Sequence, residues 1–572
     1  MKKQMQILGV LCLSGIFVLG AMWFLRGTAV SAAPNATLIV NTLVDENDGS
    51  CTDGDCSLRD ALALAATGDV IQFSVAGTIN IASLGQLTLN TNQLTIEGNQ
   101  QITINAFNSS RIFNVVATDI TLDGLTIMNG TPSGTDCGAF TLSCGGGIML
   151  QTNGAALSVT NSILQNNSAT RGGGIYNFEG TVTIINSEFL DNSTSSGGGA
   201  IYTRAPGELT VSNTVFTGNA ASDGGAVFKD GGAVTIASSV FSGNSASLSG
   251  GAILSQNSGL LTLENSQILS NTALYGGGIN HVNSISIVNS TFAYNTAQEG
   301  GGLFLSSGTH TVVNTTVSNN TATDLSGGLA SYGNLTLQNS TIVQNQAANG
   351  GAGLVGLGVS YVTTMLNHNL IVGNVLSGTT TASDVDLDNG TVDSFVSNGY
   401  NILGAVDANV VAFNQMGDQT AVSQANLGPL QDNGGLTWTH TLPMDSLAVN
   451  AGGANCAATD QRGVTRPQGV ACDVGAYELD QFSLTLSLAG TGAGHVTSSP
   501  AGIDCGTNCT FTFAADTAVT LTASPENGSF FAGWGGVCSG QGSCVVSLDQ
   551  LQNVTATFDE LYLIYLPAVE RP

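Results

Sequence analysis

The sequence predicts an all-β chain that forms a right-handed parallel β-helix with an N-terminal cap and a small C-terminal β domain. Between residues 145 and 374 one phrase recurs nine times: glycines, an aliphatic residue, an apolar strand ending in Asn or Ser, a large apolar residue and a second Asn. Its steps of 24 to 27 residues are typical of solenoids. The aliphatic residue falls at Ile148, Ile175, Ile201, Val227, Ile253, Ile279, Leu303, Leu329 and Leu354.

Each period carries strand periodicity. Thr181–Ile184 and Leu209–Val211 alternate apolar with small polar residues, which is the pattern of a β-strand with one buried face. No window shows the apolar stripe of an amphipathic helix. We therefore expect three short strands per coil, joined by tight corners at Gly and Asn.

Two Asn positions per period are interpreted as structural rather than catalytic. A residue that recurs in every coil is expected to stabilise the contact between neighbouring coils. At a strand spacing of about 4.8 Å, identical amides can bond to one another and to the corner backbone. The first position comprises Asn161, Asn186, Asn213, Asn265, Asn289, Asn314, Asn339 and Asn367, with Ser238 as the exception. The second comprises Asn166, Asn192, Asn219, Asn244, Asn271, Asn295, Asn320, Asn345 and Asn374.

The repeat resembles the GGA[ILV] and FxxN repeats of polymorphic outer membrane proteins and other bacterial surface β-helices. Its two halves read Gly-Gly-Ala-Ile at 198–201 and Phe-Thr-Gly-Asn at 216–219. The resemblance spans some 230 residues. It implies a surface-exposed β-helix and says much less about activity.

Composition narrows the classes of function. The 572 residues carry only 9% charged side chains, 42% apolar residues and a formal net charge of −28, which excludes a disordered chain. Only 11 Lys and Arg are present, so neither nucleic acid nor an anionic membrane surface is an expected partner. After the leader, no apolar stretch is long enough to span a bilayer.

Residues 1–33 read as a secretory signal peptide, with Lys2 and Lys3, an apolar run and a small-residue cleavage site; an uncleaved anchor is the alternative. We expect a secreted or cell-surface bacterial protein. The ten cysteines after the leader fall in five close couples, the usage expected of disulfides in an oxidising compartment. A zinc site built from the last four cysteines is the alternative. The couples are Cys51 and Cys56, Cys137 and Cys144, Cys456 and Cys472, Cys505 and Cys509, and Cys538 and Cys544.

Residues 34–75 are expected to form a capping module that protects the open end of the solenoid. The run 56–62 resembles the CSLREA-type module found ahead of bacterial surface β-helices, with Asp60 where that motif usually has Glu. Ser57 fits the N-cap of a short helix over 58–66. Arg59 and Asp60 are read as a surface ion pair rather than a catalytic pair.

The β-helix is expected over residues 76–374, and its end over 375–480. The segment 460–478 resembles a choice-of-anchor module, which implies attachment to the cell surface. Arg462 and Arg466 lie among Asp460, Asp473 and Glu478, and we expect an ion network that closes the C-terminal end. Residues 481–559 resemble a divergent internalin-type B repeat, a small β module that implies a spacer or binding role. Residues 560–572 form an apolar tail.

Enzymatic candidates are few. A polysaccharide lyase needs a cation and a base, and a glycoside hydrolase needs paired carboxylates. Glu179, Arg204, Lys229 and Asp230 follow the glycine corner in successive coils, and they also fit an ordinary surface salt bridge. Arg204 and Asp230 should lie one strand spacing apart in register and pair with each other.

Calcium is a second metal that the sequence could bind. The run 384–390 places Asp384, Asp386 and Asp388 at alternate positions, but it lacks Gly at the sixth position and Glu at the twelfth position of a calcium loop. The favoured interpretation has no cofactor.

The favoured function is a non-catalytic secreted or cell-surface β-helix, adhesin-like or structural. The alternative is an extracellular polysaccharide lyase or glycoside hydrolase on the same scaffold. An extracellular glycan or a cell-surface component is the expected partner, and the chain is expected to be a monomer without a membrane span.

Overall fold

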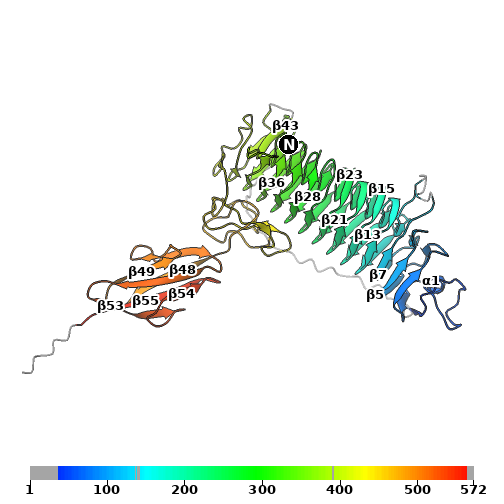
Figure 1. The fold of residues 1–572 in the computed structure, drawn as a ribbon, viewed down its shortest axis with the longest axis horizontal. Helices are drawn as coiled ribbons and strands as arrows, with labels where there is room; N and C mark the ends of the chain where they lie inside the picture. The colour runs from blue at the N-terminus through cyan, green and yellow to red at the C-terminus, as the bar shows by residue number, and fades with distance from the viewer. Residues whose placement is uncertain (1–35, 135–136, 138–141, 389–391, 563–572) are drawn as a thin grey trace, which may run out of the picture.

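The computed structural model describes residues 36–134, 137, 142–388 and 392–562. Successive coils lie side by side along one axis, and the C-terminal strands β48 to β55 form a separate body beyond them (Figure 1). The expected signal peptide and most of the tail lie outside the described residues. In the described part of the chain, no helix is long and apolar enough to cross a membrane.

Sheet B is one wall of the solenoid, with twelve parallel strands. Each pairs with the equivalent strand one coil away, as Ile175 does with Ile148 and Ile201. Its strands are β4 (Leu87–Leu89), β6 (Phe113–Val115), β8 (Ile148–Leu150), β12 (Ile175–Asn177), β16 (Ile201–Arg204), β20 (Val227–Asp230), β24 (Ile253–Gln256), β27 (Ile279–His281), β31 (Leu303–Leu305), β35 (Leu329–Ser331), β39 (Leu354–Leu357) and β43 (Val385–Asp388).

Sheet A has 25 strands and supplies two further walls of the solenoid. The repeated strands of these two walls are here called its first rank and its second rank. Its first rank is β9 (Ala156–Thr160), β13 (Thr181–Ile185), β17 (Glu208–Ser212), β21 (Val234–Ala237), β25 (Leu261–Glu264), β28 (Ile285–Val288), β32 (Thr309–Val313), β36 (Asn334–Gln338), β40 (Thr364–Asn367) and β44 (Phe395–Ser397). Its second rank is β10 (Ile163–Gln165), β14 (Glu188–Leu190), β18 (Val215–Thr217), β22 (Val240–Ser242), β26 (Gln267–Leu269), β29 (Thr291–Ala293), β33 (Thr316–Ser318), β37 (Thr341–Val343), β41 (Leu370–Val372) and β45 (Ile402–Leu403). The N-terminal strands β1 (Thr37–Val40), β2 (Val70–Phe73), β3 (Gly77–Asn80), β5 (Thr95–Asn105) and β7 (Ile120–Met128) complete it.

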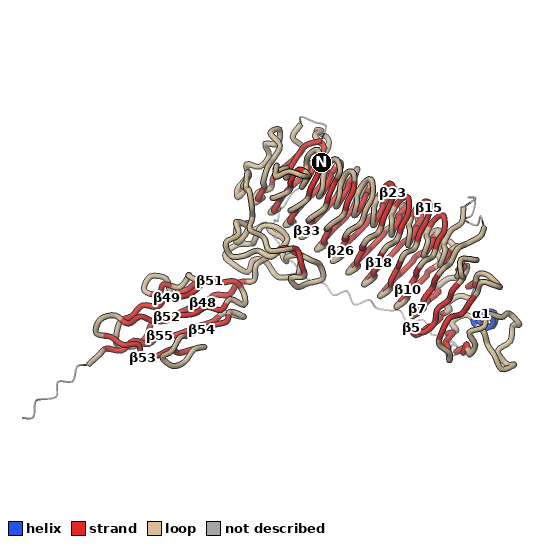
Figure 2. The backbone as a smooth tube through the Cα atoms, viewed as in Figure 1, coloured by secondary structure: helices blue, strands red, loops and turns tan. Residues whose placement is uncertain are grey.

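Two short sheets give many coils a fourth strand, where the sequence predicted three (Figure 2). Their residues are small and polar, so the alternation that marks the other strands is missing from the sequence. The first sheet is β11 (Ser168–Arg171), β15 (Ser193–Gly197), β19 (Ala220–Asp223) and β23 (Ser245–Ser249). The second is β30 (Thr296–Ala297), β34 (Thr321–Ala322), β38 (Gln346–Ala347) and β42 (Val375–Leu376).

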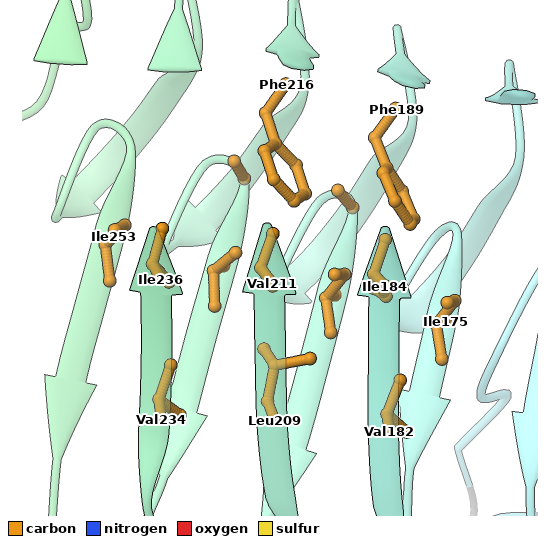
Figure 3. Close-up of a cluster of buried hydrophobic side chains, with 14 of the residues drawn as sticks. Ile175, Val182, Ile184, Phe189, Leu209, Val211, Phe216, Val234, Ile236 and Ile253 are labelled. Atoms are coloured by element: carbon orange, nitrogen blue, oxygen red, sulfur yellow. The ribbon is translucent and has the colours of Figure 1, made fainter. Parts of the chain in front are cut away.

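The core runs through the centre of the coils as stacked identical positions. Val182, Ile184, Phe189 and their equivalents one coil on point into the space between the walls (Figure 3). The rings of Phe189 and Phe216 stack at 4.9 Å between centroids. Because each coil covers the apolar face of the next, burial of these columns drives the winding.

The buried amide ladder is formed by the second Asn position, with one correction. Each of these residues donates its backbone N–H and its Nδ2 to the Oδ1 of the next one, as Asn219 does to Asn244 at 3.0 and 2.9 Å. The ladder begins at Asn167, because Asn166 adopts a positive φ of 53° and turns the corner.

The first Asn position forms little of the expected amide ladder: within the described residues, the bond between two of its side chains is from Asn186 Nδ2 to Asn161 Oδ1 at 3.4 Å. These residues turn the corner with φ near 50°, as Asn186 and Asn213 do, and His368 takes this place where Asn367 was expected. The next residue, Ser or Thr in most coils, accepts the N–H of its counterpart in the preceding coil; Ser187 accepts from Ser162 at 3.2 Å. This second, hydroxyl-rich ladder was not predicted.

The N-terminal cap contains α1 (Leu58–Leu64), whose N-cap Ser57 accepts a hydrogen bond from the Asp60 backbone as predicted. The helix ends two residues early, because Ala65 is extended. Arg59 does not pair with Asp60. It forms an ion pair with Asp45 at 2.9 Å.

The five disulfides join the predicted close couples, including Cys505 with Cys509 and Cys538 with Cys544, where zinc was the alternative. The Cys505–Cys509 and Cys538–Cys544 disulfides lie in the C-terminal body, which is built from two four-stranded sheets. Its strands are β48 (Gln481–Ala489), β49 (Gly494–Ser499), β50 (Asp504–Cys505), β51 (Thr510–Ala514), β52 (Ala518–Pro525), β53 (Ser529–Gly536), β54 (Cys544–Ser547) and β55 (Gln552–Glu560).

Residues 428–480, here called the clamp, fold back along the side of the solenoid. The clamp contains β46 (Leu430–Gln431) and β47 (Thr439–His440). Its Gln461 donates to Thr291 Oγ1 at 3.0 Å and accepts from Thr316 Oγ1 at 2.7 Å, in two neighbouring coils. The predicted ion network therefore lies at the flank of the solenoid as well as near its end.

Two buried ion pairs hold the clamp together. Arg462 pairs with Asp460 at 2.8 Å, and Arg466 pairs with Glu478 at 2.9 Å with both side chains fully buried. Asp473 lies beside them and accepts from the backbone of Asn450 and Leu479.

Candidate functional site

The four sequence-predicted catalytic residues do not form one site. Glu179 and Arg204 form a loose ion pair at 3.9 Å on the outside of the solenoid. The Arg204 guanidinium also lies 4.9 Å from the centre of the Phe178 ring. These contacts describe a surface interaction between neighbouring coils.

Lys229 lies inside the solenoid. In β20, Val227 faces the core and Phe228 faces outward, so the alternation of a strand turns Lys229 inward again. Its side chain is fully buried, and Nζ donates to the carbonyl oxygen of Ser258 at 3.1 Å. Burial lowers the pKa of Lys229 to about 8. It cannot neutralise a substrate carboxylate on the surface.

Asp230 follows on the outer face, in register with Arg204 as predicted. It accepts hydrogen bonds from the Tyr202 hydroxyl at 2.7 Å and from the Asn257 amide. Both bonds tie one coil to another. The sheet thus separates Lys229 from Asp230.

The three calcium candidates take separate structural roles. Asp384 is buried and accepts from the backbone N–H and the Nδ2 of Asn374, both at 2.8 Å, so it receives the last donors of the amide ladder. Asp386 accepts from the Ser383 hydroxyl at 2.6 Å and from the Gly351 backbone.

Asp388 belongs to a cluster that the sequence did not single out. It accepts a hydrogen bond from the Tyr332 hydroxyl, and burial together with this carboxylate raises the pKa of Tyr332. Asp386 and Asp388 line a cavity of about 190 Å³ with Asp407 and Asn349.

Asp388 is also part of a larger group of half-buried rings and carboxylates, here called the acidic–aromatic patch. Phe304 and Asp388 belong to sheet B, Tyr332 directly follows one of its strands, and Tyr275, Glu299 and Asp324 come from the corner before its strands. Phe304 contacts both tyrosines, with ring centroids 5.8 and 5.3 Å apart. Burial, then Asp324 and Asp388, raise the pKa of Glu299. Strand alternation in sheet B would have indicated only Phe304, the second residue of β31, as a side chain that faces outward here.

A further acidic group lies in the N-terminal cap. The carboxylates of Asp48, Asp53 and Asp55 lie within 4.8 Å of one another and are exposed. This group follows from the closed loop at Cys51–Cys56 and was not predicted as a site.

Two family models match parts of the chain. Residues 224–392 match a model described as a right handed beta helix region, and residues 186–204 match the repeat of the Chlamydia polymorphic membrane protein. A comparison with curated proteins finds no match.

Three solved structures resemble the chain at low identity and with low TM-scores. A pectate lyase, Pel9A, is 14% identical with a TM-score of 0.32, covering 78% of this chain and 97% of its own. A PL6 alginate lyase in complex with a trisaccharide is 12% identical with a TM-score of 0.35, covering 76% and 96%. XylC in complex with xylose is 8% identical with a TM-score of 0.34, covering 78% and 98%. The chain carries a right-handed parallel β-helix in which one stretch matches the polymorphic membrane protein repeat.

Proposed function

We propose that this chain is a non-catalytic β-helix displayed outside the cell, with a structural or adhesin-like role. The observation that carries the proposal is the placement of the candidate reactive groups. Lys229 is buried within the core, Arg204 pairs with Glu179, and Asp230 bonds two neighbouring coils. Each of these groups is used to hold the stack together.

Three observations support an extracellular location. Five disulfides fit an oxidising compartment. One stretch matches a repeat of a polymorphic membrane protein. Residues 1–33 read as a signal peptide in the sequence. We propose that residues 375–480 serve attachment, and that 481–559 act as a spacer or binding module.

The partner proposed is an extracellular glycan, bound at the acidic–aromatic patch. Half-buried rings such as Phe304 and Tyr332 offer apolar faces, and carboxylates such as Asp324 accept hydrogen bonds from hydroxyl groups. The carboxylates would repel uronates. The proposal therefore names neutral or amino sugars.

A second candidate, a glycoside hydrolase, is favoured by one feature of the same patch. Burial, then Asp324 and Asp388, raise the pKa of Glu299, which is the direction of shift that a general acid of a glycoside hydrolase requires. The lyase alternative lacks such support, because its candidate cation Lys229 is buried.

A turnover assay separates these functions. The chain without its expected leader would be incubated with neutral, amino-sugar and uronate polysaccharides, and new reducing ends and unsaturated uronates would be measured. We expect binding to a glycan without turnover. Turnover that Glu299→Gln abolishes would establish the hydrolase, and turnover that persists in this variant would place catalysis elsewhere. Either result would overturn the non-catalytic proposal.

A further inference from the structure

One inward-facing column of this apolar solenoid is polar. It consists of the third residues of consecutive sheet-B strands, paired in register one coil apart. All five side chains are fully buried. The column is Asn177, Thr203, Lys229, Ser255 and His281.

A second buried histidine lies beside the end of this column. His310 comes from β32, the first-rank strand of the coil that follows His281, and it is also fully buried. The two rings are perpendicular, with centroids 5.8 Å apart. Space around the pair is closed, since a Cβ atom added at Gly333 would lie 2.6 Å from His310 Nε2.

The first side chains of the column form hydrogen bonds, whereas the histidine at its end does not. Asn177 donates to Thr203 Oγ1 at 3.1 Å, and Lys229 donates to backbone carbonyls. Within the described residues, neither ring nitrogen of His281 or His310 has a partner at hydrogen-bond geometry, although the Ser284 backbone lies near His281. Buried imidazoles in this setting are held neutral.

The charged group that faces the pair is positive. Lys229 acts electrostatically on His281, while Asp230 on the same strand faces outward to Tyr202 and Asn257. Among the described residues, no carboxylate forms an ion pair with either histidine. A proton on either ring would therefore add positive charge to a dry corner without a counter-ion.

The effect of pH has a defined sign. Burial, then His310 and Lys229, lower the pKa of His281 to about 3, and burial lowers that of His310 to about 4. In an opened coil both rings would return to roughly 6.5. The opened coil then binds protons more tightly, so the stability of this corner is complete above about pH 6.5 and is lost as pH falls towards 3.

We infer that the His281–His310 pair is an acid-sensitive break point, at which the coils from β24 to β32 open in mild acid before the rest of the rod. Opening can stay local, because each coil of a solenoid contacts only its neighbours. The rod would thereby lose continuity in its middle while the clamp and the N-terminal coils persist.

Hydrogen exchange measured by mass spectrometry on the full chain tests this inference. After correction for intrinsic rates, we expect opening in peptides covering 253–313 to rise by about 50- to 100-fold per imidazole between pH 7 and pH 4.5. Peptides covering 157–211, which contain no histidine, serve as the internal reference. Equal changes in both regions would overturn the inference.

The matched variant is His281→Leu with His310→Leu. Leucine already occupies the equivalent positions Leu305 in β31 and Leu335 in β36, so the double variant should fold. We expect its acid response in 253–313 to fall to that of the reference coils; an unchanged response would refute the break point. If the double variant does not fold, His310→Leu alone should remove about half of the response on a logarithmic scale, and His495→Gln, at an exposed site, is the control that should leave it unchanged.

Discussion

Asn244 links its own coil to the coils on both sides of it. Its Oδ1 accepts the N–H and Nδ2 of Asn219, and its own Nδ2 donates to Asn271 Oδ1 and to the Phe216 carbonyl. In a fully buried position, each of these groups would otherwise lack a partner. The residue is therefore fixed by its neighbours in the stack, and a chemical role at the surface is excluded for it.

Replacing Asn244 with alanine should destabilise the protein strongly. The change leaves several buried donors and acceptors without partners, so we expect a loss of roughly 3–5 kcal/mol in the free energy of unfolding. Ser242→Ala, on the outer side of the same coil, is the control and should change it by less than about 0.5 kcal/mol. Denaturant titration followed by circular dichroism measures both, and similar midpoints would show that the ladder contributes little.

The prediction of individual ladder residues failed where a corner changes which side chains of the chain face inward. A single residue with positive φ at Asn166 decides that Asn167, and not Asn166, joins the ladder. Lys229 was misplaced for a different reason: regular strand alternation turns its side chain inward, although the charged residues near it in sequence suggested a surface cluster. The type of each residue was informative. Which side of the solenoid wall its side chain faces depends on backbone angles that composition does not reveal.

At the scale of the element, the glycine corner is required by close approach of backbones. Gly225 has no room for a Cβ atom, which would collide with the Gly251 carbonyl oxygen of the next coil. Gly243 differs, because it needs only a positive φ of 65° and has open space around it. The two glycines of this coil are thus required for two different physical reasons.

These two corners should respond differently to alanine. We expect Gly225→Ala to cost about 4 kcal/mol or more, because the backbone of two coils must move. Gly243→Ala should cost only about 1–2 kcal/mol of left-handed strain. Thermal unfolding of the two variants gives the comparison, and equal losses would contradict the steric account.

Strand periodicity allowed the walls of sheets A and B to be predicted, together with the cap helix at Ser57. The fourth strand of each coil could not be predicted, because runs such as 193–197 contain only small residues without alternation. The acidic–aromatic patch was missed for another reason. Its members, such as Tyr332 and Asp388, come from different coils and meet only through the register of the stack.

At the scale of the whole molecule, the clamp is the feature that sequence reasoning placed least well. Its contacts join residues well over 100 positions apart, such as Gln461 with Thr291. No local pattern encodes such a pairing. The clamp covers coils that would otherwise expose Thr291, Thr316 and Thr341.

Removing the central side chain of this interface should loosen the clamp. Gln461 bonds to Thr291, Thr316, Thr437 and the Trp438 carbonyl, so Gln461→Ala should lower stability by roughly 2–4 kcal/mol. Limited proteolysis should then cut within 428–480 first. Gln424→Ala, at an exposed position, is the control, and an unchanged cleavage pattern in the Gln461 variant would argue against docking through this residue.

The two ladders also have a direction. Along each ladder a side-chain oxygen accepts from the coil before it, and each series ends at a carboxylate, Asp384 for one and Asp418 for the other. A carboxylate can receive donors but has none to hand on. Another coil therefore cannot be appended beyond these residues, whereas a whole repeat of about 26 residues inserted between two existing ones keeps both series unbroken. The length of this rod can be changed from within but not extended at its tip.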